Sequence, residues 1–222
     1  MSRIVLKVGG AVAHSGPAHA LSLYAEGHEV CVVHGAGQQI SAEMERRGLE
    51  VAFVDGRRVT SAVALDVVRD SFAEVNAALC AAIGPPAVGL MGDEIGIEAD
   101  QVPELGLVGD PQPSRPEAIV RALRERRIPV VAPLARGPLN VNADETSVAL
   151  AVGLEAERIV FVTDVPGLLI DGGVVRLIDA DEADRLLAAD AFEGGIVPKL
   201  RAAVQAARLG LRVEIGETEV VR

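Results

Sequence analysis

Short apolar runs rich in β-branched residues alternate along this chain with longer segments in which apolar residues recur every three or four positions. The short runs predict buried strands, and the longer segments predict helices with one apolar face. We expect strands at 4–8, 29–34, 87–91, 128–133, 158–163 and 211–215, and helices at 17–26, 38–47, 60–83, 115–127, 145–153, 181–189 and 197–209. Helices separate nearly every pair of strands, so the pattern predicts an α/β protein: a three-layer αβα sandwich with a central, mainly parallel open sheet.

Two segments depart from this alternation. Between residues 92 and 110 the pattern fits two short strands, 95–98 and 105–108, which we expect to form a flap outside the main sheet. Residues 168–176 fit a hairpin about the turn Asp171-Gly172-Gly173. Thr60 is the expected N-cap of the long helix, and Ile215 is expected to end the last strand.

The first apolar run contains a lysine, Lys7, shortly before a turn at Gly9 and Gly10. Lysine is rarely buried without a partner. Lys7 is therefore either a strand-end lysine whose amine reaches solvent or a cation that meets a bound anion at the carboxyl edge of the sheet. The second strand repeats the design with Gly35-Ala36-Gly37. Two such turns side by side would direct backbone N–H groups and a helix N-terminus to one point, which is how proteins hold phosphate.

The overall charge narrows the choice of partners. The 222 residues include 32 acidic and 21 basic side chains, so the net charge is −11 and attraction to nucleic acid or to an anionic membrane is not expected. No stretch reaches the roughly 20 apolar residues of a membrane span, and the N-terminus lacks a signal pattern, so we expect a cytoplasmic protein. The two cysteines, Cys31 and Cys80, lie in apolar segments without metal-ligand spacing and are expected to be reduced core residues.

Two later motifs add polar side chains at helix starts. Asn140-Val141-Asn142-Ala143-Asp144 precedes an apolar helix, where Asn and Asp can serve as caps alone or also as binding groups, since one cap is enough. Lys199 falls in the first turn of the helix after Gly194-Gly195, where the positive end of the helix dipole disfavours a cation. A lysine in that position indicates a functional role.

Taken together, these motifs resemble the amino acid kinase family and, within it, the acetylglutamate kinases. The similarity runs in order through nearly the whole chain, over Lys7-Val8-Gly9-Gly10, Val33-His34-Gly35-Ala36-Gly37, Gly56-Arg57-Arg58-Val59-Thr60, Asn140-Val141-Asn142-Ala143-Asp144, Thr163-Asp164-Val165-Pro166-Gly167 and Gly195-Ile196-Val197-Pro198-Lys199. The lysine-glycine-glycine turn is shared across the wider family. The third and fourth of these motifs point to the acetylglutamate kinases.

The resemblance implies ATP-dependent phosphorylation of the side-chain carboxylate of N-acetyl-L-glutamate, a step of arginine biosynthesis. It implies that Lys7 and Lys199 flank the transferring phosphoryl group and that Asp144 holds them in place. Such charges suit a reaction that needs alignment and charge stabilisation rather than covalent help. The implied substrate-binding residues are Gly10, Ala36, Gly37, Arg58 and Asn140, and the implied nucleotide-side residues are Gly9, Thr163, Asp164 and Gly167.

By the same resemblance, the chain is a single domain with an amino-acid-binding lobe at about 1–133 and a nucleotide-binding lobe at about 134–222. Mg²⁺ is expected to come with ATP and to be held mainly by its phosphates, with no metal ligand assigned in the chain. We expect a homodimer formed through the long helix. In arginine-inhibited relatives an additional helix precedes the first strand, which begins here at Arg3 or Ile4, so we expect insensitivity to L-arginine.

Some features depart from the family pattern, and two other functions fit the fold. Ala36 stands where relatives usually have glycine, and a positive φ there would add strain of the order of 1 kcal/mol. The loops after Ala11 and before Asn140 are short. One alternative is a kinase for an aminoadipate or glutamate carboxylate linked to a small acidic carrier protein, which the net charge of −11 disfavours. The other is a non-catalytic amino-acid-binding regulatory module, which would need neither lysine nor Asp144.

Overall fold

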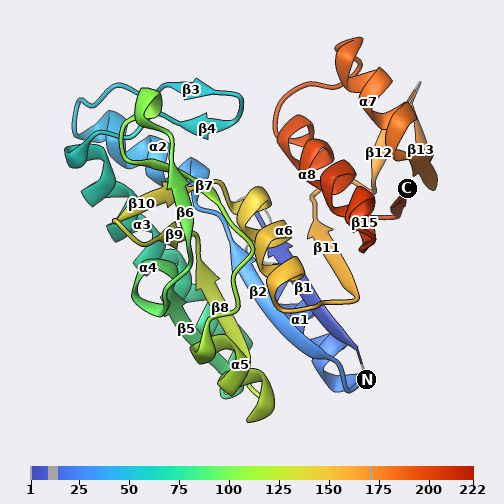
Figure 1. The fold of residues 1–222 in the computed structure, drawn as a ribbon, viewed down its shortest axis with the longest axis horizontal. Helices are drawn as coiled ribbons and strands as arrows, with labels where there is room; N and C mark the ends of the chain where they lie inside the picture. The colour runs from blue at the N-terminus through green and yellow to red at the C-terminus, as the bar shows by residue number, and fades with distance from the viewer. Residues whose placement is uncertain (1, 10–14, 171) are drawn as a thin grey trace.

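Alternation of side chains along the central strands divides the apolar core into two halves. On β1 (Arg3–Val8), Ile4, Leu6 and Val8 pack on one face of the sheet, and Val5 packs on the other. The computed structural model describes residues 2–9, 15–170 and 172–222. In this part of the chain two sets of helices cover the two faces (Figure 1). The predicted αβα arrangement is confirmed.

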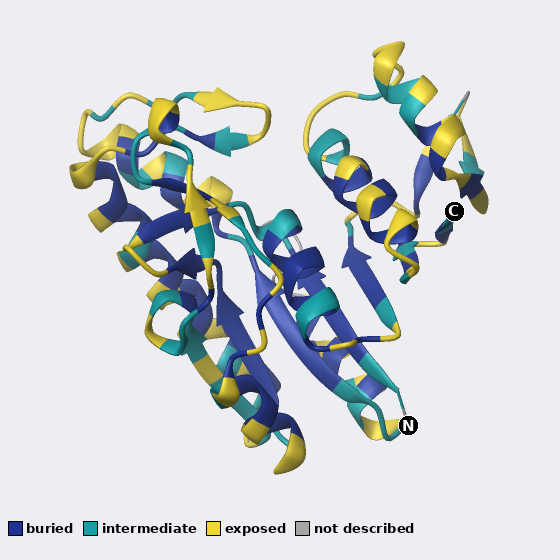
Figure 2. Cartoon of the chain, in the orientation of Figure 1, coloured by how far each residue is buried: buried dark blue, intermediate teal, exposed yellow. Residues whose placement is uncertain are grey.

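Each face of the sheet has its own helices. The face of Ile4 and Leu6 packs against α1 (Gly16–Ala25), α2 (Gly37–Arg46) and α3 (Ala62–Ile83). The face of Val5 packs against α5 (Glu117–Arg124), α6 (Ala143–Gly153), α7 (Ala180–Ala188) and α8 (Ile196–Arg208). The central strands between these helices are almost completely buried (Figure 2). No helix in the described residues has both the length and the apolar character needed to cross a membrane.

The main sheet has eight strands, and six of them run parallel. Its order is β14 (Leu177–Asp179), β16 (Thr218–Val221), β15 (Arg212–Ile215), β11 (Arg158–Val162), β1, β2 (Glu29–His34), β8 (Ile128–Ala132) and β5 (Ala87–Met91). The strands β14 and β16 run opposite to the others. The first strand lies between β2 and β11. The connections that follow these strands therefore run to opposite sides of β1, and this reversal is the topological switch point of the sheet. Ligands of open α/β sheets bind at such a switch point, beyond the carboxyl ends of the strands.

Three small sheets extend beyond the main one. A four-stranded sheet has the order β6 (Ala99–Gln101), β7 (Val108–Pro111), β10 (Leu139–Val141) and β9 (Leu134–Ala135). Two hairpins join β3 (Phe53–Val54) to β4 (Arg57–Arg58) and β12 (Leu168–Ile170) to β13 (Gly173–Val175). The second is the hairpin predicted at 168–176, although Asp171 of its turn lies outside the described residues.

The flap expected between residues 92 and 110 lies outside the main sheet, but its predicted strands were wrong. The strands are β6 and β7, and the short helix α4 (Gly92–Ile95) and a 3₁₀ turn (Pro103–Leu105) flank them. The strand β7 pairs in parallel with β10, which is distant in sequence. Local patterns do not report such a pairing, and it decides which residues become extended.

Two further predictions at element ends were wrong. Ser61, not Thr60, caps α3, because its hydroxyl accepts a hydrogen bond from the Ala64 N–H at 3.2 Å. Thr60 is fully buried, and its hydroxyl donates to the Arg58 carbonyl at 2.7 Å. The last strand is not the one that ends at Ile215, since the turn at 216–217 leads into β16.

Candidate active site

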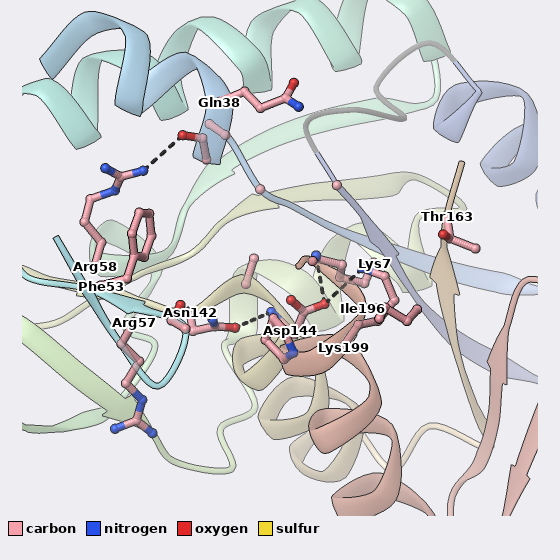
Figure 3. A pocket seen from close by; sticks show the side chains of 18 of the residues that line it. Lys7, Gln38, Phe53, Arg57, Arg58, Asn142, Asp144, Thr163, Ile196 and Lys199 are labelled. Carbon is pink, nitrogen blue, oxygen red and sulfur yellow. Dashed lines mark hydrogen bonds and ion pairs between the residues drawn. The ribbon is translucent and has the colours of Figure 1, made fainter. Parts of the chain in front are cut away.

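Gly9 and the turn Gly35-Ala36-Gly37 lie at the carboxyl ends of the central strands and line a cavity of about 710 Å³ (Figure 3). Apart from Gly10, which lies outside the described residues, all predicted site residues line this cavity: Lys7, Gly9, Ala36, Gly37, Arg58, Asn140, Asp144, Thr163, Asp164, Gly167 and Lys199. They come from strands and helices on both sides of the switch point. The structure thus brings together groups that are spread over nearly the whole sequence.

Three buried charges meet at one wall of the cavity. Lys7 lies on the sheet face of Val5, the face that α6 and α8 cover, and it reaches Asp144 in the first turn of α6. Its Nζ lies 2.8 Å from Asp144 Oδ1, and the Nζ of Lys199, in the first turn of α8, lies 3.7 Å from the same oxygen. All three side chains are at most 10% exposed. Buried ions need such partners, because an unpaired one would lose its hydration without compensation.

The protonation states follow from this geometry. Burial by itself raises the pKa of the Asp144 carboxyl, but the charges of Lys7 and Lys199 outweigh it and hold that pKa below its ordinary value. Burial, and next the charge of Lys7, lowers the pKa of Lys199 from 10.5 to about 8, against the opposing effect of Asp144. One carboxylate therefore faces two amines, and one of the amines titrates close to neutrality.

Lysine occurs nowhere else in the chain. The sequence has 21 basic residues besides histidine, and every one except Lys7 and Lys199 is arginine. An ammonium is a compact charge on a flexible stem, whereas a guanidinium is a wide planar fork. The chain has arginine at all other basic positions apart from histidine, and it has lysine only at the two positions that flank Asp144.

The Asn-x-Asn-x-Asp segment divides its tasks among three side chains. Asn142 is the cap of α6, and its Oδ1 accepts from the backbone N–H groups of Asp144 and Glu145 at 2.8 and 3.2 Å. Asn140 lies in β10 and donates to the Thr60 hydroxyl at 3.0 Å. Capping therefore explains Asn142 but neither Asn140 nor Asp144.

Arg58 is a cation without an acidic partner among the described residues. Its guanidinium donates to the Gly37 carbonyl at 3.0 Å and to the Ser41 hydroxyl at 2.8 Å, and it lies 4.5 Å from the centroid of the Phe53 ring. Burial lowers the pKa of Arg58 from its usual value, yet a guanidinium stays protonated. A buried charge with neutral neighbours, next to a cavity, is suited to bind a carboxylate.

The positive φ considered for Ala36 is absent. Its φ is −143° and its ψ is 30°, so it is not in the left-handed region that favours glycine, and it directly precedes α2. The methyl group is buried in the core between the sheet and α3. The condition under which a side chain at this position would add strain, a positive φ, is therefore not met.

Another part of the cavity lining comes from the segment after β11. The Thr163 hydroxyl accepts a hydrogen bond from the Val165 N–H at 3.4 Å, and the Asp164 carboxylate is exposed. Gly167 has a structural reason to lack a side chain, because a Cβ there would lie 2.6 Å from the Thr218 hydroxyl.

Sequence reasoning missed Phe53, Arg57 and Glu145. Phe53 stacks on Arg58, while Arg57 forms an ion pair with Glu145, the residue after Asp144. The Asp55-Gly56 pair between short extended segments was the signal for the hairpin that carries Phe53 and Arg57.

Comparison with known proteins agrees with this geometry. The model of the amino acid kinase family matches residues 2–217. The acetylglutamate kinase of Rubrobacter xylanophilus is 39% identical over 229 residues, which cover 97% of this chain and 88% of that enzyme. The acetylglutamate kinase of Koribacter versatilis is 36% identical over 228 residues and covers 94% of this chain and 87% of its own length.

A solved structure extends the agreement to the fold. The crystal structure of smu.665 from Streptococcus mutans superimposes with a TM-score of 0.91 at 27% identity, over 99% of this chain and 98% of that one. Sequence motifs, family model and fold all agree, and the chain belongs to the amino acid kinase family.

Proposed function

We infer that this protein transfers the γ-phosphoryl group of ATP to the side-chain carboxylate of N-acetyl-L-glutamate, which yields an acyl phosphate and ADP. The observation that carries this inference is the arrangement of Lys7, Asp144 and Lys199 beside a cavity that also contains the unneutralised Arg58. The relatives named above are acetylglutamate kinases that match nearly the whole chain. The reaction places the product in amino-acid biosynthesis.

The proposed chemistry needs positive charge and alignment. A carboxylate oxygen of the substrate attacks the γ-phosphorus, and the bond from that phosphorus to the bridging oxygen breaks, so the bridging oxygen leaves with ADP and carries the negative charge. Negative charge develops on the γ-phosphoryl oxygens and on the bridging oxygen. Lys7 and Lys199 are the groups proposed to stabilise that charge, and Asp144 keeps their like charges side by side.

The amino-acid substrate is proposed to bind between the hairpin of β3 and β4 and the start of α2. Arg58 binds its α-carboxylate, because two donors of a guanidinium match two carboxylate oxygens. Asn140, whose Nδ2 already donates to Thr60, offers its amide oxygen to the N–H of the acetylated amine. Gly10, Ala36 and Gly37 supply backbone N–H groups to the reacting oxygens.

ATP is proposed to bind on the side of Thr163, Asp164 and Gly167, with Gly9 near its phosphates. The described residues contain no group of three metal-ligating side chains, but the exposed Asp164 carboxylate on this wall fits a Mg²⁺ ion that arrives with ATP and is held mainly by phosphate oxygens. Such an ion would neutralise phosphate charge. The lobes at about 1–133 and 134–222 are proposed to hold the amino acid and the nucleotide.

An assay of ATP turnover separates this proposal from its alternatives. ADP release and trapping of the acyl phosphate with hydroxylamine are measured with N-acetyl-L-glutamate and with derivatives of glutamate, aspartate and aminoadipate, carrier-linked ones included. We expect turnover with N-acetyl-L-glutamate alone. Turnover only with a carrier-linked carboxylate, or binding without any turnover, would support the other functions instead.

Replacement of either lysine tests the proposed stabilisation of the transition state. Lys7→Ala and Lys199→Ala are each expected to lower kcat by at least about 100-fold with smaller effects on KM. Asp144→Asn keeps the side-chain shape but leaves the two amines uncompensated, so it is expected to lose most activity as well. Thermal melting checks the fold, and Arg124→Ala on the exposed side of α5 is the control. Near-normal kcat in both lysine variants would contradict the mechanism.

Replacement of Arg58 tests which substrate it binds. Arg58→Lys is expected to raise KM for N-acetyl-L-glutamate by roughly 10- to 100-fold, the size of a lost charged hydrogen bond, while KM for ATP stays nearly constant. Steady-state kinetics with each substrate varied in turn provide the measurement. Equal increases for both substrates would assign Arg58 a different role.

The lowered pKa of Lys199 predicts a loss of activity in mild alkali. Because the charged form is required, kcat/KM for ATP is expected to fall about tenfold per pH unit above pH 8, where Lys199 of the free enzyme loses its proton. A protein labelled with ¹⁵N-lysine has only two Nζ signals, so the titration can be assigned directly with Lys199→Arg. A kcat/KM profile that stays flat to pH 9.5 would refute the prediction.

We propose a homodimer formed through α3. The outer side of this helix carries exposed Val63 and exposed alanines, and the adjacent strand β5 is at the edge of the main sheet. Sedimentation velocity is expected to give twice the chain mass, and Ala77→Arg is expected to give the monomer. Ala189→Arg, at the end of α7, is the control. A monomeric native protein would exclude this interface.

A further inference from the structure

The hairpin of β3 and β4 is too small to hold its own position. It consists of two residue pairs around a turn in which Asp55 and Gly56 have φ values of 49° and 79°, and within the described part of the chain its strands pair with no other sheet. An isolated two-stranded hairpin is only marginally stable in water. Yet this hairpin carries Phe53 and Arg58 to the cavity. Contacts outside the hairpin must therefore fix its place.

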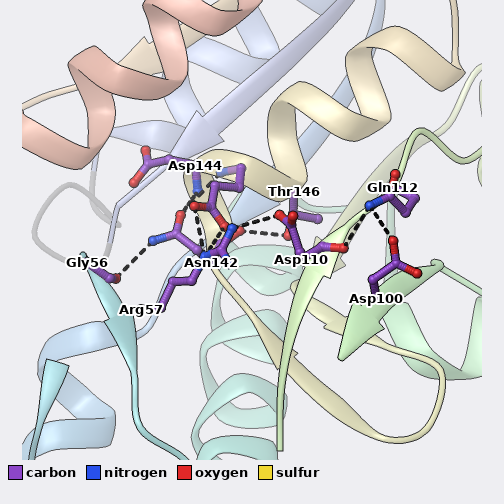
Figure 4. Close-up of polar contacts among 9 residues, drawn as sticks. Gly56, Arg57, Asp100, Asp110, Gln112, Asn142, Asp144 and Thr146 are labelled. Atoms are coloured by element: carbon purple, nitrogen blue, oxygen red, sulfur yellow. Dashed lines mark hydrogen bonds and ion pairs between the residues drawn. The ribbon is translucent and has the colours of Figure 1, made fainter. Parts of the chain in front are cut away.

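Arg57 provides several of these contacts (Figure 4). Its Nε donates to both carboxylate oxygens of Glu145, at 3.1 and 3.0 Å, and its Nη2 donates to Asp110 Oδ1 at 2.7 Å. Glu145 belongs to the first turn of α6 and Asp110 to β7. One guanidinium thus joins the hairpin to α6 and to the four-stranded sheet.

The ion pair of Arg57 with Glu145 is partly buried, so solvent screens it less than it screens an exposed pair. The side chains of Arg57 and Glu145 are 20% and 27% exposed. Exposed pairs contribute little because solvent screens them, but a partly buried pair with two hydrogen bonds is screened less. Burial raises the pKa of the Glu145 carboxyl, and Arg57 is the group that opposes this change.

Further contacts join the tip of the hairpin to segments next to the proposed phosphoryl-transfer residues. The Asn142 amide, which caps the helix of Asp144, donates to the Gly56 carbonyl at 3.0 Å. A Cβ on Gly56 would lie 3.2 Å from Pro198, the residue before Lys199. The hairpin therefore lies against the starts of both α6 and α8.

The two neighbouring arginines have opposite charge environments. Arg57 is balanced by two carboxylates, whereas Arg58 has none among the described residues. A balanced arginine is suited to hold structure, and an unbalanced one is suited to hold an anionic ligand. Their adjacency means that the anchoring of Arg57 sets the position of Arg58.

We propose that Arg57 is a positioning residue: through Glu145 and Asp110 it holds the hairpin closed over the cavity and so presents Arg58 and Phe53 to the amino-acid substrate. This assignment rests on the proposed function. When the anchor is removed, open hairpins become populated. The apparent Kd of a ligand that binds only the closed form then rises, because it equals the intrinsic Kd divided by the fraction of the protein that is closed. Saturating ligand still closes the site.

The kinetic test compares substrate affinity with turnover. Arg57→Leu is expected to raise KM for N-acetyl-L-glutamate about tenfold, with kcat and KM for ATP within about twofold of the native values. Glu145→Gln, which leaves Asp110 as a partner, is expected to raise the same KM about threefold. The double variant is expected to match Arg57→Leu, because Glu145 acts on the hairpin only through Arg57 and has no further effect once Arg57 is gone. Arg57→Lys is expected to restore part of the affinity.

The matched control is Arg208→Leu. Arg208 also bridges two carboxylates, Asp181 and Asp184, at 2.8 and 2.7 Å, but it is exposed and lies on α8 outside the cavity lining. We expect no change in either KM. If the loss of any arginine with two acidic partners raised KM, the KM values of Arg208→Leu would rise as well.

Hydrogen exchange of the protein without substrates tests the anchor independently of activity. Peptides that cover residues 52–59 are expected to exchange at least about fivefold faster in Arg57→Leu and in Glu145→Gln, and unchanged in Arg208→Leu. Unchanged exchange in both hairpin variants would overturn the proposal. An unchanged KM for N-acetyl-L-glutamate in Arg57→Leu would overturn it too, as would a KM in the double variant that rises by the product of the two single increases. If the native protein lacks activity toward N-acetyl-L-glutamate, the proposed function fails, and exchange alone then decides whether Arg57 holds the hairpin.

Discussion

The contact of the Asp144 carboxylate with two buried ammonium groups is the interaction on which the site depends. Lys7 comes from the central strand β1 and Lys199 from the start of α8, and their Nζ atoms lie 2.8 and 3.7 Å from one carboxylate oxygen. Without Asp144, two like charges would be buried together, which is strongly unfavourable. The contact therefore requires that α6 and α8 cover the same face of the sheet and begin at the same edge. The position of the switch point at β1 satisfies this requirement.

The charged groups around the cavity are of two kinds: those paired with an opposite charge of the protein and those without such a partner among the described residues. Arg57 and Asp144 have their charges compensated by the protein. Arg58 is surrounded by the Phe53 ring, a carbonyl and a hydroxyl, so an arriving carboxylate would complete its environment. Since the net charge of the chain is −11, attraction of an anionic substrate has to be local. The cations that provide it are concentrated at this single edge of the sheet.

Most of the candidate site could be located from the sequence because its residues stand beside strong local signals. Glycine-rich turns after apolar strands mark the carboxyl edge of a parallel sheet, and Lys7 interrupts an otherwise apolar strand. The same reasoning failed where the decisive neighbour is distant in sequence. Thr60 resembles a cap, but its contact with Asn140 makes it a buried bridge, and Ser61 caps α3 instead. In the segment 92–110, β7 pairs with the distant β10, and β6 pairs with β7.

The sequence by itself determined the αβα class, the central strands of the main sheet and the residue types available for phosphate and carboxylate binding, because hydrophobic periodicity and turn residues are local properties. The tertiary structure decided which charges are compensated. Arg57 and Arg58 are adjacent and chemically identical, and only the positions of Glu145 and Asp110 distinguish them. It also decided the backbone at Ala36, whose φ of −143° cannot be read from residue type. Both outcomes depend on contacts between segments far apart in the chain, and a local pattern carries no record of those contacts.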